Sequence, residues 1–204
     1  MDTMEKTQDM FNIIKTRRSI RRYKPQEVPE EHLNRILEAA RWAPSAINRQ
    51  PWKFIVVRDR EIKEKIGDAS KFYFVLNRNV SEAPIIIVVC TKDNAYKWAT
   101  VDCAMASQNI MLEAHSLGLG SCFIGAFDEH KVKQILDLPD KMGIIALITI
   151  GYPDGQVETP PRIEKDEIVS YDVYNQKKKS AKLRNILTPK SGVLSVISKV
   201  LNRK

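Results

Sequence analysis

The sequence has few cysteines and histidines, and neither residue type shows a spacing that would give it a common role. Cys90, Cys103 and Cys122 are odd in number and form no CxxC or metal-ligand pattern. Each lies in an apolar or helical setting, which predicts buried, reduced thiols. The three histidines are scattered, with no HExxH and no cluster of carboxylates of ligand spacing, so no metal site is predicted.

Long hydrophobic runs and nucleotide-binding glycine motifs are also missing. No apolar run reaches the length of a membrane span and the first ten residues lack the apolar core of a signal peptide, which predicts a cytoplasmic protein. The chain has no GxxxxGK[ST] and no GxSxG. Gly118-Leu119-Gly120 does not open a dinucleotide-binding GxGxxG, because Phe123 fills the third glycine position. If the protein is an enzyme, we expect a cofactor to carry the chemistry.

Basic charge is concentrated at one end of the chain. The net charge is +8, but nine of the 33 basic residues and none of the 25 acidic residues lie in residues 177–204. Residues 1–176 therefore have no basic excess, and we expect no nucleic-acid partner. We expect residues 1–176 to form one domain and residues 177–204 to be a basic extension with an amphipathic helix. That extension is typical of an arm packed on its own dimer, of a helix that contacts a membrane surface or an acidic partner, or of a disordered tail.

The apolar pattern predicts helices and strands without regular alternation, which favours an α+β fold. Asp9 is expected to cap a first helix whose apolar residues, Met10, Phe11, Ile13 and Ile14, face the core. A helix at 98–117 is apolar on more than one side and is expected to be buried. Residues 72–79 are expected to form an exposed flap. Further helices are predicted near 29–42, 60–67 and 128–136, and strands near 54–57, 85–90, 122–124, 144–150 and 168–173.

A basic segment follows the first predicted helix. Arg17-Arg18-Ser19-Ile20-Arg21-Arg22-Tyr23 concentrates four guanidinium groups within six residues. Guanidinium groups make paired, charge-assisted hydrogen bonds to phosphate. A solvated basic surface, or charges that suit the dipole at a helix C-terminus, would give the same composition.

Two further segments carry groups that could bind a ligand. Pro44-Ser45-Ala46-Ile47-Asn48-Arg49-Gln50-Pro51 places a hydroxyl and two amides in a loop braced by two prolines, although serine and asparagine also bond their own backbone in ordinary turns. Gly125 and Ala126 lie between a predicted strand and a helix capped by Asp128, where their N–H groups either donate to a ligand or form an ordinary joint. Together with the basic segment, these groups suggest a bound, phosphorylated aromatic cofactor.

In these segments the chain resembles the nitroreductase family of FMN-dependent flavoproteins. The resemblance covers about Phe11 to Tyr174 and implies an α+β sandwich, with a mostly antiparallel central sheet flanked by helices. It also implies an intertwined homodimer with two FMN sites at the interface. The motifs that carry it, in the family's order, are Arg17–Arg21, Ala43–Trp52, Gly118–Asp128, Ile150–Pro153, and Pro161-Arg162 before Glu167.

The resemblance also implies a role for individual residues. At positions that match the family's motifs, Arg17, Ser19 and Arg162 would bind the FMN phosphate and ribityl chain. The backbone of Arg18 would contribute to the same site. Arg21 would lie beside flavin N1 and O2. The partner subunit would contribute a loop with Pro44, Ser45, Ala46, Asn48 and Gln50. Backbone N–H groups around Ile124, Gly125 and Ala126 would approach flavin N5 and O4. No side chain is needed as an acid or base, so no catalytic residue is named.

The implied activity is an oxidoreductase that takes hydride from NAD(P)H and reduces a nitroaromatic, quinone or similar small electrophile by a ping-pong mechanism. Reductive dehalogenation or flavin-fragmenting oxygen chemistry, both found in the same superfamily, is an alternative. These reactions need substrate-gripping lid residues, of which the short connection at residues 91–97 gives no sign. A non-catalytic, flavin-binding regulatory module whose basic tail recruits a partner is an alternative from another class.

Overall fold

The computed structural model describes residues 9–70, 78–92, 96–170 and 174 of the chain. The chain divides into two units, Met1–Val157 and Glu158–Lys204, and each is described by itself. The predicted extension at 177–204 lies outside the described residues, so its helix and its contacts stay predictions. Among the described residues, no helix is both long and apolar enough to cross a bilayer.

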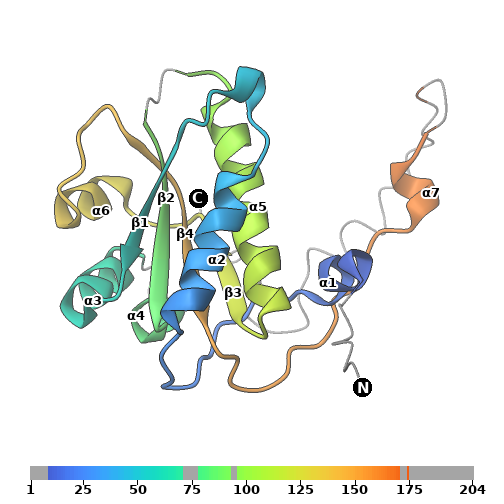
Figure 1. The fold of residues 1–204 in the computed structure, drawn as a ribbon, viewed down its shortest axis with the longest axis horizontal. Helices are drawn as coiled ribbons and strands as arrows, with labels where there is room; N and C mark the ends of the chain where they lie inside the picture. The colour runs from blue at the N-terminus through green and yellow to red at the C-terminus, as the bar shows by residue number, and fades with distance from the viewer. Residues whose placement is uncertain (1–8, 71–77, 93–95, 171–173, 175–204) are drawn as a thin grey trace, which may run out of the picture. The chain divides into compact units, whose positions relative to one another are not determined.

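The first unit is built on a four-stranded antiparallel sheet (Figure 1). The strands lie in the order β1-β2-β4-β3, so that the two longest strands occupy the centre. Every residue of the central strand β2 is buried, because helices cover both faces of the sheet. The strand bounds are β1 (Trp52–Val57), β2 (Ile85–Thr91), β3 (Gly120–Ile124) and β4 (Gly143–Gly151).

Two layers of helices sandwich the sheet, and alternate residues of β2 face one layer and then the other. Ile85, Ile87 and Val89 pack in the core under α2 (Glu30–Arg41) and α5 (Ala99–Ser116). Ile86, Val88 and Cys90 pack on the opposite side, in the core that α3 (Arg60–Ala69), α4 (Arg78–Glu82) and α6 (Glu129–Ile135) cover. The predicted α+β fold, with an antiparallel sheet flanked by helices, is confirmed. The three cysteines are free and buried, as predicted.

One local prediction is wrong, and most of another lies outside the described residues. The strand predicted at 168–173 does not begin at Ile168, because this residue ends the short helix α7 (Lys165–Ile168) of the second unit, whose first turn is acidic. Residues 171–173 lie outside the described residues. In the predicted flap, Arg78 and Asn79 lie in helix α4, which is anchored by the fully buried Val80. The flap residues 72–77 lie outside the described residues.

Two helices expose apolar residues that we expected to be buried. In α1 (Met10–Thr16) only Ile13 is buried, whereas Met10, Phe11 and Ile14 are 60%, 68% and 50% exposed. Among its described residues, this seven-residue helix buries one side chain. Along α5, the residues Trp98, Val101 and Met105 are also exposed, and we call them the α5 stripe. Their spacing places them on one face of the helix, opposite the buried Cys103 and Ala106.

Candidate functional site

The basic segment lies against the sheet as an extended strap, residues 17–23, that follows α1. Ser19 forms a parallel bridge with Ser121, and the N–H of Ile20 donates to the carbonyl of Ser121 at 2.9 Å. Further along, Tyr23 forms an antiparallel bridge with Pro153. Backbone bonds on both sides of Ile20 therefore fix the path of the strap.

Two side chains press the strap onto the sheet where glycines make room for them. Ile20 lies so close to Gly120 that an added Cβ would come within 2.5 Å of Ile20 Cγ1. At Gly151, an added Cβ would come within 2.9 Å of the Tyr23 ring. The Tyr23 hydroxyl donates to the carbonyl of Ile20 at 2.7 Å and lies 2.7 Å from Oγ1 of Thr149. Burial raises the pKa of Tyr23, so this hydroxyl stays protonated and keeps its donor role.

The strap places its positive charges near β3 and the last turn of α5. Burial raises the pKa of the Cys122 thiol, while the guanidinium groups of Arg21 and Arg17 lower it. Burial lowers the pKa of His115, and Arg17 and Arg18 lower it further. Arg18 Nη1 also donates to the carbonyls of Lys15 and Arg17, at 2.8 and 2.7 Å. The strap therefore carries a local positive field, as binding of an anion requires.

The second predicted segment, residues 44–50, follows α2 and is called the amide loop. It contains a 3₁₀ turn, Ala46–Asn48, and three non-glycine residues in left-handed conformation: Ile47 (φ 50°), Asn48 (φ 58°) and Gln50 (φ 48°). Such residues are strained and persist only where neighbouring groups hold them.

Several polar groups of the amide loop are used within the loop itself. Ser45 Oγ accepts from the N–H of Gln50 at 3.0 Å. The side-chain amide of Gln50 donates to Oδ1 of Asn48 at 3.0 Å and to its carbonyl at 3.2 Å. Turn chemistry therefore explains part of the composition of this loop, as the ordinary reading of the motif predicts. It does not explain the strained backbone.

The strap and the amide loop lie at opposite ends of α5 (Figure 1). Next to the strap, Thr16 Oγ1 lies 2.8 Å from Nε2 of His115, in the last turn of α5. The amide loop contacts the first turn, where the N–H of Ala46 donates to Oδ1 of Asp102 at 3.1 Å. At a rise of 1.5 Å per residue, these two points of α5 are about 20 Å apart. The two predicted segments are therefore attached near opposite ends of the same helix.

The third segment ends strand β3. Ile124 is buried as the last residue of the strand, and Gly125 and Ala126 after it are exposed. An added Cβ on Gly125 would meet nothing closer than 3.8 Å, so there is space above this backbone. The Asp128 carboxylate accepts from the N–H of Lys131 at 3.1 Å and caps α6 as predicted. The Asp128 cap therefore fixes the start of α6, while Gly125 and Ala126 at the end of β3 stay exposed.

Arg162 belongs to the second unit and is exposed. Its role at a phosphate, which the family resemblance implies, stays a prediction.

Sequence reasoning missed Asp102, which lies in the first turn of α5 and is 3% exposed. Its Oδ1 binds the amide loop, and no donor from the described residues reaches its Oδ2. The available signal was an acidic residue next to Cys103 on a helix that the sequence predicts to be buried.

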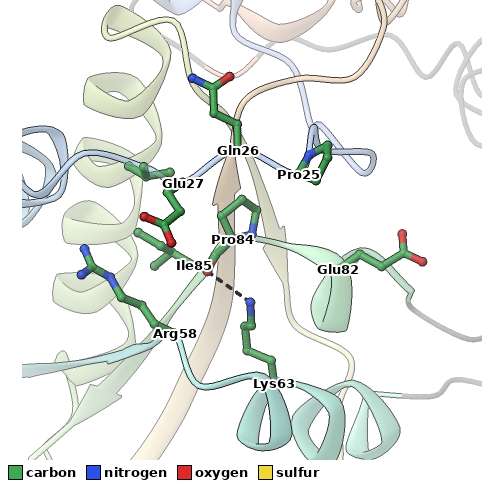
Figure 2. Close-up of a pocket in the computed structure, with 9 residues that line it drawn as sticks. Pro25, Gln26, Glu27, Arg58, Lys63, Glu82, Pro84 and Ile85 are labelled. Atoms are coloured by element: carbon green, nitrogen blue, oxygen red, sulfur yellow. Dashed lines mark hydrogen bonds between the residues drawn. The ribbon is translucent and has the colours of Figure 1, made fainter.

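A pocket of about 350 Å³ lies at the start of β2 and is lined in part by residues 25–28, which follow the strap (Figure 2). Its two cationic side chains already have partners in the protein. Lys63 Nζ donates to the carbonyls of Ala83 and Pro84, at 2.8 and 3.2 Å. Arg58 forms an ion pair with Glu30 at 2.6 Å. None of the residues that line the pocket is a predicted cofactor contact.

Comparison with known proteins identifies the family of this chain. The profile of the nitroreductase family matches residues 14–73 and 70–152, which include the strap, the amide loop and β3. The chain belongs to the nitroreductase family. A protein of Methanothermobacter thermautotrophicus, whose name joins NADH dehydrogenase and NAD(P)H nitroreductase, is 40% identical over 168 residues, or 78% of this chain and 85% of that protein.

Two other relatives bear on the chemistry. The structure of an FMN-dependent nitroreductase from Clostridium difficile shares 30% identity with a TM-score of 0.68, over 82% of this chain and 99% of that chain. An iodotyrosine deiodinase of Thermotoga neapolitana is 26% identical over 186 residues, or 81% of this chain and 98% of that protein. Family membership makes this protein an oxidoreductase.

Proposed function

We propose that the protein is a homodimeric, FMN-dependent oxidoreductase that takes hydride from NAD(P)H and reduces a nitroaromatic, quinone or similar electrophile. Membership of the family supports the class of reaction, and the names of two relatives support the electron donor and the flavin. The observation that carries the proposal is the separation of the strap from the amide loop along α5. An FMN site that uses both segments needs two copies of the chain.

A two-fold dimer would join the strap of one protomer to the amide loop of the other. Such a dimer must bury surface, and the single chain has two suitable regions: the apolar face of α1 and the α5 stripe. Large apolar side chains gathered on an exposed helix face are typical of an interaction surface.

The groups at the proposed site fit an FMN. Arg17 and Ser19 would supply the cationic and hydroxyl donors that a phosphate binds, the backbone of Arg18 would add a further donor, and Arg162 of the second unit would add a cation. The buried Ser121 Oγ, beside Ser19 in the strap bridge, has no partner among the described residues and could donate to the same anion. At the end of β3, the N–H groups of Gly125 and Ala126 could donate to a flavin edge.

When bound, FMN would supply hydride and electron transfer, so the protein has to supply only binding and orientation. Arg21 would place a fixed positive charge beside the pyrimidine edge of the flavin and stabilise negative charge there. The backbone of Gly125 and Ala126 would orient the opposite edge. No acid or base residue enters the proposal, and the donor and the acceptor would bind in turn, which gives ping-pong kinetics.

Anaerobic mixing of the purified protein with NADH or NADPH tests this function. We expect a yellow protein whose oxidised-flavin absorbance disappears on mixing and returns when a nitroaromatic or a quinone is added. A bound flavin that neither nucleotide reduces would favour the non-catalytic regulatory module. A protein that binds no FMN would refute the proposal.

The double variant Arg17→Ala/Arg162→Ala tests the phosphate site, because it removes two of the charges that would neutralise the anion. We expect it to retain much less FMN than the native protein. Arg60→Ala is the matched control, since Arg60 is exposed on α3 and pairs only with Glu64 among the contacts described. Equal flavin content in the double variant and the control would contradict the placement of the phosphate.

Reductive dehalogenation is a second candidate, because the deiodinase of Thermotoga neapolitana aligns with most of this chain. Release of iodide from an iodinated phenol by the reduced protein, compared with its turnover of a nitroaromatic, distinguishes the two reactions.

A further inference from the structure

We infer that Asp102 is a positioning residue that holds the amide loop in the conformation needed at the cofactor site, an inference that rests on the proposed FMN site. The loop carries three left-handed non-glycine residues within four positions, at Ile47, Asn48 and Gln50. A loop of this kind adopts other conformations unless external contacts hold it.

Among the described residues, the side chains of Asp102 and Tyr96 contact the amide loop. The N–H of Ala46 donates to Asp102 Oδ1 at 3.1 Å, and the carbonyl of Ala46 accepts from the Tyr96 hydroxyl at 3.3 Å. The guanidinium of Arg49 stacks on the Tyr96 ring, 4.4 Å from its centroid. Tyr96 precedes α5 and is not in a helix or strand, whereas Asp102 lies in the first turn of an eighteen-residue helix. Asp102 is therefore the rigid member of this set.

The surroundings of Asp102 argue against a purely structural role. Its side chain is buried, and Oδ2 has no donor from the described residues. A buried carboxylate oxygen without a donor is unfavourable, so packing alone would favour an apolar residue here. Favourable interaction with the N-terminus of α5 is the competing explanation, since anions stabilise that end of a helix. Asparagine at position 102 separates the two explanations, because it loses the charge that the helix N-terminus favours but keeps an oxygen that accepts from the N–H of Ala46. If the tether matters, the asparagine variant keeps the loop in place; if the charge matters, it does not.

Asp102 also connects two parts of the proposed dimer. It lies on α5 next to Val101 of the α5 stripe, and it holds a loop that would reach the flavin of the other protomer. Loss of the tether should therefore affect cofactor binding without a change in the strap.

The test uses the full-length protein as purified, with Asp102→Ala, Asp102→Asn and the control Ser107→Ala. Ser107 is buried on the same helix, and its hydroxyl donates to the carbonyl of Cys103 at 2.8 Å, away from the loop. Two quantities are measured: hydrogen exchange of the amides of residues 45–50, and the Kd of FMN from flavin fluorescence on dilution.

We expect Asp102→Ala to accelerate exchange in the loop and to raise the Kd at least about tenfold. Asp102→Asn should restore most of both properties, and Ser107→Ala should lower the melting temperature with neither effect. Unchanged loop exchange in Asp102→Ala, or an asparagine variant that behaves like the alanine variant, would overturn the inference.

Two provisions keep the test decisive. If Asp102→Ala does not fold, Asp102→Asn carries the test, because it keeps the oxygen that accepts from Ala46; faster exchange in the loop and a raised Kd in that variant would overturn the inference. If the native protein binds no FMN, the proposed function fails, but loop exchange still decides whether Asp102 is the tether.

Discussion

Substitution of Gly120 by alanine should displace the strap and weaken FMN binding. The added Cβ would lie 2.5, 2.7 and 2.8 Å from Cγ1, Cβ and Cγ2 of Ile20. Carbon atoms pack at about 3.5–4.0 Å, so the two residues must separate by about 1 Å. Rotation of the Ile20 side chain cannot relieve the clash, because Ile20 Cβ moves only with its backbone.

That backbone is bound on both sides, so the clash has consequences beyond Ile20. Its N–H donates to Ser121 and its carbonyl accepts from Tyr23. Overpacking of this kind costs about 1–3 kcal/mol of folding free energy. A strap shifted by about 1 Å also misplaces Arg17 and Ser19, and loss of a single charge-assisted bond, about 1.5–3 kcal/mol, corresponds to a tenfold or greater rise in the Kd of FMN.

Thermal unfolding and FMN titration of Gly120→Ala measure the two effects. Gly67→Ala is the control, because its Cβ would lie 3.1 Å from Cβ of Ser81, where helices α3 and α4 meet, and it would not touch the strap; we expect its FMN affinity to be native. Native affinity in Gly120→Ala would show that the position of the strap does not determine cofactor binding, and would refute this reasoning.

Three further predictions concern the dimer and pH. Coexpressed Arg17→Ala and Asp102→Ala chains should form mixed dimers with one intact site, so their flavin content should exceed that of either homodimer; equal content would place the strap and the loop of one site in the same chain. Met105→Asp puts a charge into the α5 stripe and should yield flavin-free monomers by size-exclusion chromatography, whereas Val157→Asp, at another exposed apolar position, should remain dimeric. Burial, Arg17 and Arg18 lower the pKa of His115 below 6.5, so the unfolded chain takes up its proton first and the stability due to this group falls as pH drops below about 6.5. His115→Gln should flatten that part of the stability profile measured by urea unfolding, and an unchanged slope would exclude His115 as its source.

The parts of the fold that the sequence predicts well are those whose apolar pattern the chain itself satisfies. Ile85–Cys90 reads as a buried strand, and it is one because both of its faces meet helices of the same chain. The predictions for Phe11 and Val101 fail for the complementary reason. Hydrophobicity predicts that a residue is covered, but it does not tell whether the same chain or another molecule covers it.

For the site, the motifs predict which segments matter but not how they are held. The strap and the amide loop are visible as local clusters of guanidinium, hydroxyl and amide groups. Their separation along α5 depends on tertiary packing, which no local pattern contains. Asp102 escaped notice because one acidic residue in a helix is usually a solvent-exposed charge, and only the structure reveals its burial and its bond to Ala46. Ile168 shows the opposite failure, since the stretch predicted as a strand begins at the last residue of a short helix.

The length of α5 has a consequence for how such an enzyme would be loaded. With the proposed phosphate-binding strap at one end of this helix and the amide loop at the other, a lone chain would offer FMN only part of the proposed contacts. Occupancy would then rise with protein concentration as well as with free cofactor, because ligand binding and subunit association stabilise each other. Newly synthesised chains would stay colourless until each met a second copy, and dilution would release the pigment as pairs separate.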